Sequence, residues 1–125
     1  MQLTSVVSPE VLKIRPEAPL SEAVKAMNKH NLGSVAVTVE DRLVGIFTER
    51  DLLRAVADGA NINTTEVSEW MTAPADTVEV SMQIREAAEW MLASGYRHLP
   101  VVENGMVVGM VSIKDVMWGL TAADY

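Results

Sequence analysis

A hydroxyl residue followed three positions later by an aspartate occurs twice in the chain, as Thr48 with Asp51 and as Ser112 with Asp115. Each pair ends an apolar run that starts at a glycine, as expected where a strand passes directly into a helix. The hydroxyl can cap the free N–H groups of the first helical turn. Those N–H groups and the helix dipole can also hold a phosphate, while the aspartate can accept hydrogen bonds from a ribose diol. The residues therefore suggest nucleotide binding.

A plain capping box explains any single pair of this kind without a ligand, and that alternative stays open for each copy. Two copies at the same spacing from equivalent residues favour a function that both motifs share. Thr48 and Ser112 are 112 − 48 = 64 residues apart, and Gly45 and Gly109 have the same separation. The offset extends over most of the chain, which predicts two repeats of about sixty residues that pack as one domain over residues 1–125.

Composition narrows the classes of function. The chain has 125 residues, 49% of them hydrophobic, and a net charge of −7 with only ten Lys and Arg, so a nucleic-acid partner is not expected. There is no Cys and there are only two His, which disfavours disulfides and a metal site. Neither a signal peptide nor an apolar run long enough to span a membrane is visible, and we expect a cytoplasmic protein.

Hydrophobic periodicity and turn signals predict the same element order, β-α-β-β-α, in both repeats. Residues up to about Glu10 are expected to be a lead-in segment before the first repeat. Residues 67–72 are expected to form one helical turn that returns the chain to the core. Met27 and Met91 fall on apolar helix stripes and are expected in the core. The first repeat is expected to have a strand at 11–14, a helix from Pro19 to Asn31, strands at 34–39 and 42–47, and a helix from Glu49 to Gly59. The second is expected to have a strand at 77–80, a helix capped by Ser81 and ended by Gly95, strands at 98–102 and 106–111, and a helix from Ile113 to about Leu120.

These motifs together resemble tandem CBS domains, the paired repeat called a Bateman module. The resemblance rests on residues 33–37 (GSVAV), 48–51 (TERD), 70–74 (WMTAP), 97–102 (RHLPVV) and 109–115 (GMVSIKD). It implies an α+β fold with two repeats about a pseudo-twofold axis, at about 6–62 and 70–122. It also implies two clefts that bind adenosine-containing ligands and regulate a partner, without catalysis or a required metal. AMP is the expected nucleotide, with ADP and ATP as further candidates.

Carried over by position, the resemblance assigns the ribose aspartates to Asp51 and Asp115 and the nearby hydroxyls to Thr48 and Ser112. Phosphate cations would be Arg50, Lys114 and Arg97, although Arg50 and Lys114 are equally well explained as solvated side chains. Adenine would lie against Lys13, Ile14, Gly33, Ser34, Val35 and Ala36 in the first repeat and against Thr77, Val78, Tyr96, Arg97, His98, Leu99 and Pro100 in the second. Since Arg97 and His98 replace Gly33 and Ser34, the second site gains a cation and an imidazole and is the better-supported assignment, whereas the first would accept a different ligand or rely on Arg50 alone.

Two further readings stay in play: a structural dimerisation module whose clefts remain empty, and a small enzyme, for which no catalytic constellation is visible. Trp90 and Trp118 would each widen the apolar face of a helix, and the resemblance implies association through these helices. We therefore expect a homodimer, and an effector protein that the sequence does not identify.

Overall fold

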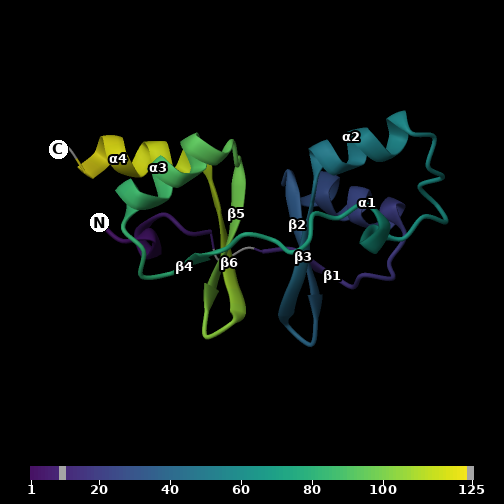
Figure 1. The fold of residues 1–125 in the computed structure, drawn as a ribbon, viewed down its shortest axis with the longest axis horizontal. Coiled ribbons are helices and arrows are strands. Elements are labelled where there is room, and N and C mark those ends of the chain that lie inside the picture. Colours follow the sequence, from purple (N-terminus) through teal and green to yellow (C-terminus); the bar gives the residue numbers. More distant parts are fainter. Residues whose placement is uncertain (9–10, 124–125) are drawn as a thin grey trace. The chain divides into compact units, whose positions relative to one another are not determined.

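The computed structural model describes residues 1–8 and 11–123. The chain divides into two compact units, Leu12–Ala75 and a second unit that joins Met1–Val11 to Asp76–Tyr125 (Figure 1). Each unit contains a short strand, two longer strands and two α-helices in the predicted β-α-β-β-α order. The predicted α+β class is confirmed.

In the unit Leu12–Ala75 the middle strand β2 pairs in parallel with β1 and antiparallel with β3. Helices α1 and α2 lie on the same side of β2 and β3 (Figure 1). The elements are β1 (Lys13–Ile14), α1 (Leu20–His30), β2 (Ser34–Val39), β3 (Arg42–Thr48), α2 (Glu49–Ala57) and the 3₁₀ turn η2 (Val67–Glu69).

The second unit repeats this arrangement, with β5 between a parallel β4 and an antiparallel β6. Helices α3 and α4 again lie on one side of their strands (Figure 1). The elements are the 3₁₀ turn η1 (Leu3–Ser5), β4 (Val78–Glu79), α3 (Ile84–Ser94), β5 (His98–Glu103), β6 (Met106–Ser112) and α4 (Ile113–Ala123), so α4 runs past the predicted end at Leu120.

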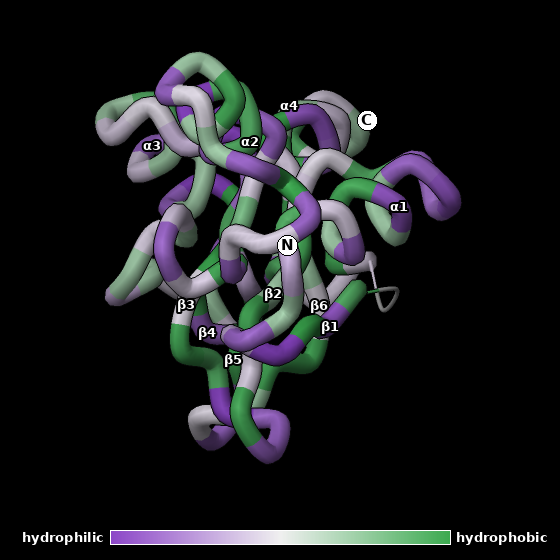
Figure 2. Tube along the Cα trace, turned by 90° about the vertical axis from the view of Figure 1, so that its right-hand side faces the viewer, coloured by the Kyte–Doolittle hydropathy of each residue, from purple (hydrophilic) through white to green (hydrophobic). Residues whose placement is uncertain are grey.

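Both hairpins close through two residues with positive φ, Glu40 and Asp41 in one and Asn104 and Gly105 in the other. Two positive φ values match the twist of the flanking strands. The turns are hydrophilic, purple in Figure 2. A register shift follows Val37 in the first hairpin and Val101 in the second, the same offset of 64. The predicted two-residue turns are confirmed.

Each unit has its own aliphatic core between its helices and strands. Met27 is 5% exposed and Met91 is 1% exposed, as the helix stripes predicted. The middle strands are buried along most of their length, which explains why β2 and β5 are nearly continuous apolar runs (Figure 2). The core of Leu12–Ala75 includes Ile14, Leu20, Val35, Phe47 and Val67, and the other core includes Leu3, Val78, Ile84, Leu99 and Val111.

Two predicted helix starts are wrong. Ser81 does not cap α3: the N–H of Met82 closes a turn on the Glu79 carbonyl (3.0 Å), and the helix begins only at Ile84. The Ile84 N–H donates to the carbonyl of Met1 (2.9 Å), so the N-terminal segment supplies the missing acceptor. Pro19 is the residue before α1 rather than its first helical residue.

Residues 3–8 are not a lead-in, because they pack into the core of the second unit. Leu3 is fully buried, and Ser8 exchanges backbone hydrogen bonds of 3.1 and 3.2 Å with Met110 on β6. Thr72 does the same with Ile46 on β3, at 3.0 and 2.8 Å. Residues 3–8 and 67–72 are therefore counterparts at the offset of 64, and the predicted return of 67–72 to a core is confirmed.

Candidate functional site

The two hydroxyl–aspartate pairs form capping boxes, each at the point where a strand passes into a helix. At the start of α2 the Thr48 N–H donates to Asp51 Oδ2 (2.9 Å), and the Asp51 N–H donates to Thr48 Oγ1 (3.2 Å). At the start of α4 the Ser112 N–H donates to Asp115 Oδ2 (3.4 Å), and the Asp115 N–H donates to Ser112 Oγ (3.1 Å). The capping reading of both motifs is confirmed.

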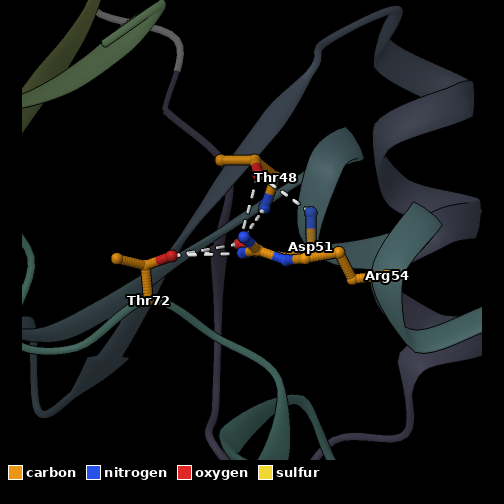
Figure 3. Close-up of polar contacts among 4 residues, drawn as sticks. All are labelled: Thr48, Asp51, Arg54 and Thr72. Carbon is orange, nitrogen blue, oxygen red and sulfur yellow. Dashed lines mark hydrogen bonds and ion pairs between the residues drawn. The ribbon is translucent and has the colours of Figure 1, made fainter. Parts of the chain in front are cut away.

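Asp51 makes further contacts through its second oxygen (Figure 3). The Arg54 guanidinium forms an ion pair with Oδ1, and Thr72 Oγ1 donates to the same oxygen at 3.2 Å. The side chain of Asp51 is only 1% exposed, whereas that of Arg54 is 57% exposed. Both carboxylate oxygens of Asp51 therefore already have donors from the protein.

Asp115 differs from Asp51, because its described hydrogen bonds use only one carboxylate oxygen. Ser112 Oγ donates to Oδ2 at 2.8 Å, in addition to the Ser112 N–H. Among the described residues, none donates a hydrogen bond to Oδ1 of Asp115. Asp115 is half-buried rather than buried. Trp118 stands where Arg54 stands in the other repeat, 54 + 64 = 118, and it carries no charge.

In the unit Leu12–Ala75, the predicted residues fall into two groups. Ser34 is buried and pairs with Thr48 across the sheet, and the Gly33 carbonyl accepts from the Glu49 N–H (3.1 Å), so these two residues lie beside the start of α2. Arg50 is the second residue of α2 and is exposed. The other predicted residues lie on the strands: Ile14, Val35 and Ala36 are buried, and Lys13 pairs with Asp41 (3.3 Å).

The second unit brings its turn to α4 in the same way. His98 pairs with Ser112 across the sheet, and the Arg97 carbonyl accepts from the Ile113 N–H (2.9 Å). Tyr96 donates its hydroxyl to Asp76 and packs edge-on against Trp90, with ring centroids 6.0 Å apart. The remaining predicted residues are divided between interior and surface: Val78, Leu99 and Pro100 are buried, Thr77 is half-buried, and Arg97 and Lys114 are exposed.

Comparison with known proteins decides the family. The family model described as "CBS domain" matches residues 3–58 and 67–121. The chain belongs to the CBS domain family. Its two matched stretches are two CBS repeats, and each includes one of the 3₁₀ turns that precede the β-α-β-β-α elements.

Several relatives share this CBS pair. An uncharacterized 17.7 kDa protein from Acidianus ambivalens is 36% identical over 117 residues, which are 92% of this chain and 70% of that protein. The CBS-domain containing protein ATU1752 from Agrobacterium tumefaciens, which has a crystal structure, is 32% identical to this chain. Its structure matches with a TM-score of 0.88 over 96% of this chain and 99% of that one.

Two more distant structures share the fold. The CBS domain pair of protein MJ0100, solved in complex with methylthioadenosine and S-adenosyl-L-methionine, is 24% identical with a TM-score of 0.88 over 100% and 98% of the chains. A hexameric CBS-CP12 protein from bloom-forming cyanobacteria is 24% identical with a TM-score of 0.89 over 100% and 75%. CBS proteins of this fold therefore include an adenosyl-ligand complex and an oligomer.

Sequence reasoning missed Arg54 and Thr72, which both contact the Asp51 of the first CBS repeat. Arg54 could have been found, since a cation three residues after an aspartate lies on the same helix face. Thr72 could not be placed by spacing alone, because it reaches Asp51 from 21 residues away.

Within the described part of the chain, no cluster of metal-ligating side chains is found, and none of the described helices is long and apolar enough to span a membrane.

Proposed function

We propose that this CBS pair is a regulatory module that binds an adenosine-containing ligand, with AMP as the expected nucleotide, and signals to a partner protein. The observation that carries the proposal is the half-buried Asp115, whose Oδ1 accepts no hydrogen bond from the described residues. It lies at the start of α4, where helix N–H groups favour an anion. An acceptor in this position suits a ribose diol beside a phosphate.

The comparisons add general support. The CBS pair of MJ0100, which shares the fold, was solved with two adenosyl ligands. Adenosine is the part common to those ligands and to AMP, ADP and ATP. We infer that adenosine is the part of the ligand recognised here, with the turns that lead into Ser34 and His98 beside it and Arg97 or Lys114 near a phosphate.

A thermal-shift screen tests this function. A ligand present at 100 times its dissociation constant stabilises the native state by about 2.7 kcal/mol. For a chain of this length that raises the melting temperature by about 5 °C or more. We expect such a rise with AMP, ADP, ATP or S-adenosylmethionine. GMP is the matched control, since it keeps the ribose and phosphate but changes the base, and should give a smaller shift. A flat melting temperature with every adenosine ligand would overturn the proposal.

A second candidate function is a structural dimerisation module. It is favoured by large apolar side chains that the second unit leaves in solvent: Trp118 and Leu92 are each 65% exposed, and Met117 is 45% exposed. Trp90, by contrast, is partly buried against its own core. We propose a homodimer through α3 and α4 in either case. The structural module alone predicts no thermal shift with nucleotide, whereas the regulatory module predicts one.

A further inference from the structure

The two CBS repeats present chemically different carboxylates at equivalent positions. In Asp51 the capping bonds from Thr48 use Oδ2, while Arg54 and Thr72 use Oδ1. In Asp115 the capping bonds from Ser112 also use Oδ2, and Oδ1 accepts nothing from the described residues. The main difference in hydrogen bonding between the two aspartates is therefore at Oδ1, although Thr72 Oγ1 also reaches Oδ2 of Asp51 at 3.5 Å.

The sequence gives a direct cause for this difference. Position 54 is Arg and its counterpart 118 is Trp, so only the first repeat places a cation one helical turn after the aspartate. Ser8 is the counterpart of Thr72, 72 − 64 = 8, and it shares the backbone pairing with β6, but no hydrogen bond from its side chain to Asp115 is found. Oδ1 of Asp51 therefore has two donors, Arg54 and Thr72, that Oδ1 of Asp115 lacks among the described residues.

The ion pair between Arg54 and Asp51 should compete with a ligand. The guanidinium adds the attraction of an ion pair to its hydrogen bond, whereas a ribose hydroxyl would give the carboxylate a hydrogen bond alone. A ribose hydroxyl that approached Oδ1 of Asp51 would have to displace a guanidinium and replace a charged donor with a neutral one. At Asp115 the same hydroxyl would fill an open acceptor.

We propose that Arg54 is the residue that makes the two repeats unequal, closing the carboxylate of Asp51 so that one adenosine ligand binds per chain, at Asp115. This inference rests on the proposed function and specifies which repeat carries it. The exposed guanidinium of Arg54 acts on the ligand only by holding Asp51. Arg54 is therefore a specificity-determining residue.

Titration calorimetry with AMP tests the inference through stoichiometry. The wild-type chain should bind one AMP with measurable heat, and any binding at Asp51 should be at least about tenfold weaker. Arg54→Met should raise the stoichiometry from one to two per chain. The matched control is Arg42→Met, which removes the same charge from an exposed position on β3 of the same unit and should leave one AMP per chain.

A reciprocal variant tests the idea without altering the first repeat. Trp118→Arg places a guanidinium three residues after Asp115, as Arg54 is placed after Asp51, and should weaken AMP binding at least about tenfold. Trp118→Phe is its control and should bind like the wild type. This pair of variants keeps the inference testable even if Arg54→Met does not fold, and melting without ligand identifies that case.

The possible outcomes distinguish failure of this inference from failure of the proposed function. Two equal AMP sites in the wild-type chain would overturn the role of Arg54 and leave the regulatory function standing. A single site abolished by Asp51→Ala but not by Asp115→Ala would do the same. Absence of binding by AMP and every other adenosine ligand would overturn both.

Discussion

Capping and ligand binding are compatible in one aspartate because a carboxylate has two oxygens. The capping box at the start of α4 uses Oδ2 of Asp115 and leaves Oδ1, which accepts no hydrogen bond from the described residues. In Asp51 the same capping box also leaves Oδ1 unused, but Arg54 and Thr72 donate to that oxygen. Whether a hydroxyl–aspartate pair can accept a ligand is thus decided by a residue outside the motif.

Replacing the open aspartate should separate the two roles of this side chain. Asp115→Ala removes hydrogen bonds to a charged acceptor, worth about 1.5–3 kcal/mol, so AMP affinity should fall about 10- to 100-fold. Loss of the cap should also lower the free energy of unfolding by about 0.5–2 kcal/mol. Calorimetry well below the melting temperature measures the first effect and denaturant unfolding the second.

Asp51→Ala is the matched control, since it removes the same capping contacts from the other repeat. It should destabilise the protein by at least as much, because Asp51 is buried and accepts more hydrogen bonds, but change AMP affinity by less than about threefold. Equal losses of affinity in both variants, or none in Asp115→Ala, would contradict this assignment of roles.

At the scale of elements, local patterns predicted most of what the structure contains. The apolar runs of β2 and β5 and the turn residues Asn104 and Gly105 act locally, so their elements appear where expected. The predicted start of α3 was wrong because the N–H of its first residue, Ile84, bonds to Met1, 83 residues away (84 − 1 = 83). Spacing does not reveal a contact of that length, although extending the repeat back to Leu3 would have indicated it.

The two strand glycines, Gly45 and Gly109, show why residues 3–8 matter. A methyl group on Gly109 would come within 2.6 Å of the Ser8 backbone oxygen, and one on Gly45 within 3.0 Å of the Thr72 oxygen. For the methyl group on Gly45, the nearest atom is the Met71 sulfur at 2.7 Å, which lies at the flexible end of a side chain. Glycine at both positions therefore permits the close approach of a second backbone segment.

We therefore predict that Gly109→Ala costs more than Gly45→Ala. Overpacking costs about 1–3 kcal/mol, and Gly109→Ala should lie at the upper end because backbone must move, while Met71 can adopt another rotamer. Urea unfolding of both variants checks the order. Hydrogen exchange at Met110, whose N–H bonds to Ser8, should become faster in Gly109→Ala alone. Equal losses of unfolding free energy in the two variants would show that the backbone of residues 3–8 moves as easily as that of residues 67–72.

For the whole molecule, the open question is what covers the apolar side chains of α3 and α4. Trp118, Leu92 and Met117 are exposed on helices that pack against each other. The counterparts of Trp118 and Leu92 in the first repeat are the polar residues Arg54 and Asn28, whereas that of Met117 is Leu53, itself 69% exposed. A single exposed apolar residue needs no explanation, but a group of them on adjoining helices marks an interaction surface.

We predict a homodimer that depends on this surface. In sedimentation at micromolar concentration, Trp118→Glu should weaken association at least about thirtyfold, since a central aromatic contact is worth about 2 kcal/mol or more. Trp118 is preferred to Trp90 for this test because Trp90 also packs on Tyr96 and its loss would disturb folding. Val39→Glu is the matched control: Val39 is 48% exposed at the end of the β2–β3 hairpin, outside the proposed contact, and its variant should remain dimeric. A wild-type monomer, or a Trp118→Glu dimer of unchanged affinity, would contradict this assignment of the interface.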